Sequence, residues 1–140
     1  MKISGNIVDV FNSKIYAGTI VIKNDRIVDI IRESRRYKTF IIPGFIDSHV
    51  HIESSMLVPS EFGRMAVIHG SVAAVSDPHE IANVLGIEGV QYMIENGKTV
   101  PFRFCFGASP CVPATPFETA GASLGVEQIE DLLENGETKY

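Results

Sequence analysis

Residues 43–55 read Pro43-Gly44-Phe45-Ile46-Asp47-Ser48-His49-Val50-His51-Ile52-Glu53-Ser54-Ser55. Alternate residues of a β-strand share one face of the sheet. One face would then be mostly apolar and would pack against helices, which predicts a buried strand. The other face would be polar, and a buried polar face with imidazole and carboxylate groups indicates a divalent transition-metal site. The residues of that polar face are Phe45, Asp47, His49, His51 and Glu53.

Two histidines separated by one residue are a weak signal when taken alone, because an exposed strand carries such pairs by chance. The Pro43-Gly44 turn, the nearby Asp47 and the apolar opposite face all favour the metal-site interpretation. His49 and His51 are therefore the predicted metal ligands.

The composition excludes several classes of protein. The chain has 140 residues, which is enough for one modest domain with its own core. No apolar run approaches the roughly 20 residues that a membrane-spanning helix needs. The net charge is −5 and no basic stripe occurs, which argues against a nucleic-acid groove.

The cysteines and the N-terminal charges indicate a cytoplasmic protein. Cys105 and Cys111 are the only cysteines and form no Cys-x-x-Cys pair, so two reduced thiols are expected rather than a disulfide framework. Lys23, Asp25 and Arg26 interrupt the N-terminal apolar pattern, so we expect no signal peptide.

Residues 1–42 predict a small antiparallel sheet. Turn residues separate three β-branched or alternating segments: 2–11, 15–23 and 26–31. Three strands make a marginal sheet, so further strands are expected from elsewhere. The arginines of residues 32–36 are expected on a solvated connection, with phosphate binding as the alternative.

From residue 43 the pattern changes to alternating strands and helices. Strands are predicted at 71–75 and 100–106, and helices at 59–68, at 87–97 after an interruption at Gly86, and at 126–133. Phe102, Phe104 and Phe106 share one face and are expected in the core. Such alternation predicts a parallel sheet with right-handed crossovers. Three units cannot close an eight-stranded barrel, so the sheet stays open or belongs to something larger.

Polar residues after the second strand of this series are further site candidates. Ser76-Asp77-Pro78-His79-Glu80 follows a buried apolar run, where polar groups are costly unless they function or reach water. We favour function for His79 and Glu80; the alternative is a solvated loop in which Asp77 caps the following helix. Glu53 either faces the site or turns outward, and His69 is expected at the surface. The loop 107–121 contains Cys111 and Glu118 and is long enough to be functional.

Three motifs carry a resemblance to a known family. Residues 43–51 resemble the first barrel strand of the amidohydrolase superfamily, and residues 49–55, 77–84 and 111–121 resemble its bacterial and archaeal adenine deaminase family. The resemblance implies that 1–42 is part of a small β-sandwich-like domain. It also implies that 43–140 forms the first three β/α units of a (β/α)₈ barrel, so the fold class is α/β.

The resemblance further implies a binuclear centre of Mn, Fe or Zn ions, with His49 and His51 among its ligands. The implied reaction is hydrolytic deamination of adenine to hypoxanthine and ammonia by a metal-activated hydroxide. The family's other ligands and its catalytic aspartate come from later strands, so residues 1–140 alone are expected to be inactive. The parent protein is expected to be a homo-oligomer.

Substrate contacts are expected from Glu53, His79 and Glu80. An acidic Glu53 would repel a carboxylate, which favours a neutral base over an acidic substrate. His79 and Glu80 would contact the purine or a metal. Two alternatives stay open: another amidohydrolase, such as a cytosine deaminase or a cyclic amidase, or a non-catalytic module that binds a metal or a partner through an exposed sheet edge.

Overall fold

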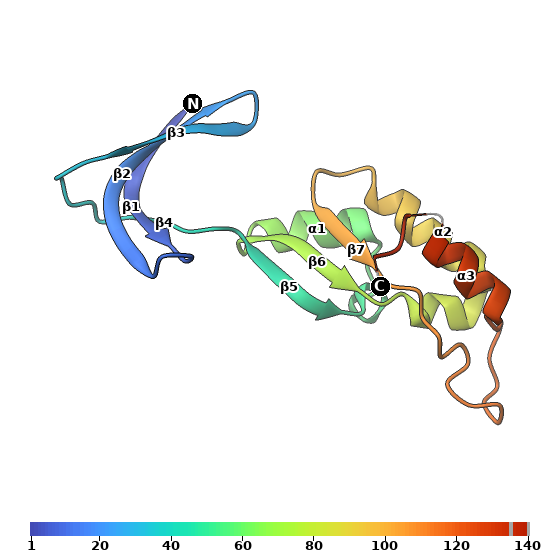
Figure 1. Cartoon of the computed structure of the whole chain (residues 1–140). Helices are drawn as coiled ribbons and strands as arrows, with labels where there is room; N and C mark the ends of the chain where they lie inside the picture. Colours follow the sequence, from blue (N-terminus) through green and yellow to red (C-terminus); the bar gives the residue numbers. More distant parts are fainter. Residues whose placement is uncertain (135, 140) are drawn as a thin grey trace. The chain divides into compact units, whose positions relative to one another are not determined.

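The computed structural model describes residues 1–134 and 136–139. The chain divides into two compact units, Met1–Pro43 and Gly44–Tyr140 (Figure 1). Among the described residues, no helix combines the length and the apolar character that crossing a bilayer requires.

The first unit is a four-stranded sheet with the order β3-β2-β1-β4. β1 (Lys2–Asp9), β2 (Lys14–Lys23) and β3 (Arg26–Arg32) pair antiparallel, as the sequence predicts. β4 (Phe40–Ile41) pairs parallel with β1, so the sheet is mixed rather than purely antiparallel. The prediction missed β4 because two residues are too few to show an alternating pattern.

At the end of β3 and in the segment after it, Arg32, Arg35 and Arg36 are exposed, as predicted, and polar contacts of their neighbours fix the position of this segment. The Glu33 carboxylate accepts hydrogen bonds from the Thr19 and Tyr37 hydroxyl groups, both at 2.5 Å. These hydrogen bonds stabilise the ionised form and lower the pKa of Glu33 from its ordinary value of 4.5. The Arg35 guanidinium lies 4.9 Å from the centre of the Tyr37 ring.

The variant Glu33→Gln is expected to lose stability at neutral pH and to lose less of it in acid. The folded-state pKa lies below the unfolded one, so the contribution of Glu33 is present above the unfolded pKa and disappears as the pH falls through the folded pKa. Denaturant unfolding at neutral pH and at about pH 3 measures the free energy of unfolding of wild type and variant. The difference between the two proteins should be smaller in acid. The control is Asp25→Asn on the β2–β3 turn. An equal difference in unfolding free energy between wild type and Glu33→Gln at both pH values would contradict the expectation.

The second unit alternates strands and helices, as predicted. β5 (Phe45–Val50), β6 (Ser71–Ser76) and β7 (Arg103–Phe106) form a parallel sheet with the order β5-β6-β7. α1 (Pro59–Val67) contacts β6 and α2 (His79–Gly97) contacts β7, and α3 (Val126–Glu134) follows a long loop. At the end of the described chain, Thr138 forms a parallel bridge with Phe106.

The core of this unit lies where α2 and α3 pack near β7. Phe102 and Phe106 are 8% and 3% exposed, and the Phe104 ring lies between them with centroid distances of 4.8 and 5.6 Å. The predicted core face of this strand is therefore confirmed. The buried residues of the core cluster are Ile52, Ala82, Val90, Met93, Ile94, Phe106, Val112 and Leu132.

Three predictions about the strands are wrong. β5 is not buried: it lies at the sheet edge with β6 as its partner, and Phe45 and Ile46 are 56% and 65% exposed. β5 also ends at Val50, because the chain turns there into the short 3₁₀ helix η1 (Ile52–Ser55). β7 starts at Arg103 rather than Val100, since its register with β6 begins with the Ala73–Arg103 pair.

The predicted proline and glycine signals hold in α1 and α2, but the predicted start of α2 at residue 87 is wrong, because the chain is already helical from His79. Pro59 occupies the first turn of α1, and Gly70, which follows that helix, has a φ of 91° that a residue with a Cβ adopts only with strain. Gly86 interrupts α2 with φ 62° and ψ −143°, so α2 consists of two helical segments joined at this residue.

Gly63 on α1 allows a close approach that a larger residue would prevent. A Cβ at this position would lie 2.9 Å from the Cβ of Phe102. We expect Gly63→Ala to lower the free energy of unfolding by about 1–3 kcal/mol, because overpacking must displace the helix or the ring. Thermal unfolding of the complete gene product measures this against Gly125→Ala, whose Cβ would have only the Gln128 Oε1 atom nearby, at 3.6 Å. Equal midpoints for the two variants would contradict the expectation.

Candidate metal centre

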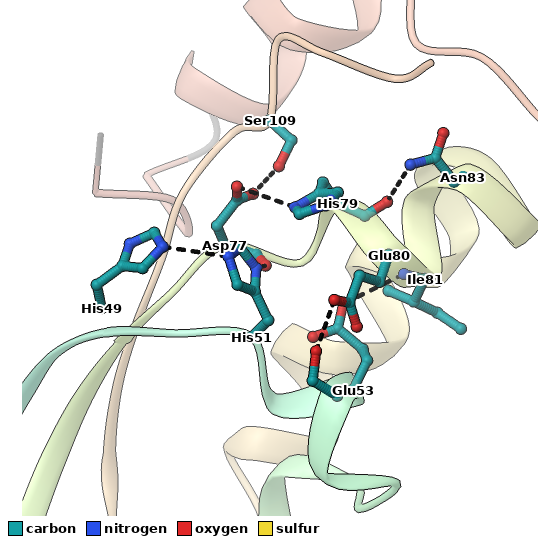
Figure 2. Close-up of polar contacts among 10 residues, drawn as sticks. His49, His51, Glu53, Asp77, His79, Glu80, Ile81, Asn83 and Ser109 are labelled. Carbon is teal, nitrogen blue, oxygen red and sulfur yellow. Dashed lines mark hydrogen bonds and ion pairs between the residues drawn. The ribbon is translucent and has the colours of Figure 1, made fainter. Parts of the chain in front are cut away.

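The two predicted metal ligands meet at the carboxyl end of β5. The strand carries His49, and His51 follows directly, at the N-cap of η1. Their Nε2 atoms lie 3.1 Å apart, and the ring centroids are 4.8 Å apart in an edge-to-face arrangement (Figure 2). The structure therefore brings together the two nitrogen atoms that would bind a common ion, although His49 is exposed and His51 only half-buried.

A backbone carbonyl fixes the orientation of His51. The Nδ1 atom of His51 lies 2.9 Å from the carbonyl oxygen of Asp77. A carbonyl oxygen can only accept, so Nδ1 carries the hydrogen and Nε2 keeps its lone pair. This is the usual state of a metal-binding imidazole, whose second nitrogen donates to a carbonyl or carboxylate.

Asp77 connects a third histidine to the site. Its Oδ2 atom lies 3.2 Å from His79 Nδ1, and its Oδ1 atom accepts a hydrogen bond from the Ser109 hydroxyl (Figure 2). The His79 ring lies edge-to-face with His51, with centroids 4.6 Å apart. His51, Asp77 and His79 each offer an atom within 4.8 Å of the others, so this group also has the composition of a cation site.

Asp77 and Ser109 are the site residues that the sequence interpretation did not select. Asp77 was considered only as a helix cap, yet α2 has Pro78 at its N-cap with no side-chain cap. The signal that could have found Asp77 is its place two residues before His79, at the end of β6. Ser109 lies 32 residues from its partner and stands in a loop without periodicity, so no local pattern indicates it.

Glu53 lies on η1, so the prediction that it shares a strand face with the histidines is wrong. Its Oε1 atom accepts a hydrogen bond at 3.2 Å from the backbone N–H of Ile81, in the first turn of α2. Glu53 thereby satisfies one of the N–H groups that a helix start leaves open. Its Oε2 atom is buried and has no hydrogen-bond partner within the described part of the chain.

Glu80 and the remaining candidates lie outside the group formed by the three histidines and Asp77. The Glu80 carboxylate accepts a hydrogen bond at 2.6 Å from the Ser54 hydroxyl, near Glu53 (Figure 2). His69 and Glu118 are exposed. Cys105 and Cys111 are both free thiols, as expected from the sequence.

Comparisons with known proteins agree with this geometry. A sequence profile described as "Amidohydrolase family" matches residues 40–139. The chain is 56% identical over all of its length to an adenine deaminase of Sulfurovum sp. (strain NBC37-1), and 52% identical over 99% of its length to one of Salinibacter ruber. It is 53% identical over 94% of its length to an adenine deaminase of Methanothermobacter thermautotrophicus. The chain spans about a quarter of each of these relatives, between 24% and 26%.

Proposed function

Because the chain belongs to the amidohydrolase family and corresponds to the N-terminal portion of adenine deaminases, we propose that its gene product hydrolyses adenine to hypoxanthine and ammonia. The reaction replaces the exocyclic amino group by oxygen from water. The structural observation that carries the proposal is the 3.1 Å approach of the His49 and His51 Nε2 atoms at the end of β5.

The donor set fits a divalent transition metal. His51 is oriented through Nδ1, which leaves Nε2 free to bind, and His49 Nε2 lies beside it. His49 and His51 would hold the ion, and imidazole ligands suit Mn, Fe or Zn. When bound, the ion lowers the pKa of water toward neutrality and so provides the hydrolytic nucleophile. The further ligands of a binuclear centre would come from segments outside residues 1–140.

Three side chains are proposed to contact adenine, which is neutral and presents N–H donors and ring nitrogens. Glu53 keeps one carboxylate oxygen without a partner among the described residues, and that oxygen is a possible acceptor for a substrate N–H group. His79 is held through Nδ1, so its Nε2 atom remains free for a ring nitrogen. Glu80 is the next residue after His79, and its half-buried carboxylate already accepts a hydrogen bond from Ser54.

The same proposal extends to architecture. β5, β6 and β7 would be the first three strands of a (β/α)₈ barrel, with the histidines at the carboxyl ends of the strands, where barrel active sites lie. The sheet of Met1–Pro43 would be part of a β-sandwich domain. We propose a cytoplasmic homo-oligomer as the working form.

Ammonia release by the complete, Mn-loaded gene product tests the proposal. Adenine is expected to be preferred over cytosine, which also releases ammonia, and over a cyclic amide such as dihydrouracil, whose hydrolysis releases no ammonia and is followed instead as the loss of the intact ring. A preference for cytosine or for the cyclic amide would assign a different amidohydrolase reaction. Metal binding in a stable oligomer without turnover of any of the three would indicate a binding module instead.

A further inference from the structure

The loop of residues 107–125 is attached at its start to the segment that carries His79. The Gly107 N–H donates to the Ser76 carbonyl at 3.0 Å, which extends the pairing of β7 with β6. Two residues later the Ser109 hydroxyl donates to the Asp77 carboxylate. Ser109 is only 3% exposed, so this hydrogen bond is shielded from competing water.

The far end of the same loop is attached to α2, four residues beyond His79. The Gly121 and Ala122 N–H groups both donate to the Asn83 carbonyl, at 2.8 and 3.1 Å. The fit is close, because a Cβ at Gly121 would lie 2.8 Å from the Val84 carbonyl oxygen. Between the two attachments, Val112 is 3% exposed and belongs to the core.

The turn between these attachments holds His79 at two points, the ring and the backbone carbonyl. Asp77 Oδ2 contacts the His79 ring, and the Asn83 side-chain amide donates to the His79 carbonyl at 3.0 Å. Each oxygen of the Asp77 carboxylate has its own partner, Ser109 on one and His79 on the other. Rotation of Asp77 away from His79 would therefore also break the bond from Ser109.

We propose that Ser109 is a positioning residue: through Asp77 it sets the orientation of the His79 imidazole beside His51. The loop of residues 107–125 is thus part of the site, and the hydrogen bond of Ser109 goes to Asp77, which in turn contacts His79. This inference rests on the proposed function, because positioning is measured as a change in adenine turnover.

The test compares Ser109→Ala with wild type in the complete, metal-loaded gene product. We expect kcat/KM for adenine to fall by about 10–100-fold, the usual effect of losing an outer-shell partner, while bound metal per chain stays the same. Ser109→Cys keeps a side chain of similar size with a weaker donor, and an intermediate value is expected. Ser123→Ala is the matched control, because Ser123 is an exposed serine of the same loop.

A double-mutant cycle separates positioning from general loop stability. If Ser109 acts through Asp77, Ser109→Ala causes little further loss of kcat/KM once Asp77→Asn is present. Additive losses in the double variant would overturn the inference, because Ser109 would then act by another route. An unchanged kcat/KM in Ser109→Ala would overturn it as well.

Amide hydrogen exchange of residues 77–83 gives a readout that needs no turnover. Ser109→Ala is expected to speed exchange there and to leave β1 unchanged, whereas unchanged exchange in 77–83 would overturn the coupling. If wild type does not deaminate adenine, the proposed function fails, and this exchange measurement still decides whether Ser109 holds the turn.

Discussion

His51→Ala is expected to remove bound metal and to reduce adenine turnover by more than about 100-fold, the upper range for losing only an outer-shell partner. The substitution removes the Nε2 atom that faces His49 and also the Nδ1–H that donates to the Asp77 carbonyl. His49→Ala should be similarly severe, because it removes the other nitrogen of the pair. Elemental analysis of the purified complete gene product measures the metal, and ammonia release measures the turnover.

The control for both variants is His69→Ala. His69 is exposed after the end of α1, and its substitution should change neither metal content nor turnover. Full metal content in His51→Ala with normal turnover would refute the metal-ligand assignment. Loss of metal in His69→Ala as well would mean that the purification, rather than the site, determines the metal content.

Residues 1–140 expressed alone are expected to show no adenine turnover. The chain spans about a quarter of the adenine deaminases that it resembles, and we expect further metal ligands and the catalytic aspartate of the proposed centre to lie in segments outside residues 1–140. The piece is also expected to self-associate, because β5 is an open sheet edge with exposed Phe45 and Ile46.

The decisive comparison uses the piece and the complete gene product side by side, each loaded with the same metal. Ammonia release from adenine measures activity, and light scattering measures association. Measurable adenine turnover by rigorously purified 1–140 would refute the expectation. If the His51→Ala piece, purified in the same way, releases as much ammonia as the wild-type piece, that release comes from a contaminating host deaminase and not from the piece.

Local chemistry made much of the fold predictable. Pro59 and Gly70 frame α1, Gly86 interrupts α2, and the alternating phenylalanines mark the buried face of β7, all through short-range signals. What failed was the extent of individual strands. A strand stops where pairing with its neighbour stops, and the register between β6 and β7 involves residues about 30 positions apart.

In the candidate site, too, local patterns were predictable and long-range contacts were not. His49 and His51 are separated by one residue, so their spacing, together with the Pro43-Gly44 turn and Asp47, indicated a shared site. Glu53 was assigned to a strand face because alternation was extended past Val50, whereas the turn into η1 sends its carboxylate to the N–H of Ile81. The role of Ser109 depends on a hydrogen bond to Asp77, 32 residues away, and a single sequence contains no local pattern that indicates such a contact.

The joint at Gly86 has a consequence for protein engineering. The segment before it carries His79 and Glu80, while Val90 and Met93 beyond it fill the interior. A chimaera that takes its residues up to Gly86 from one relative and the following residues from another would exchange interior packing while keeping the chemistry-bearing turn intact. Recombination libraries with a crossover at this glycine should therefore retain more working members than libraries that cut α2 elsewhere.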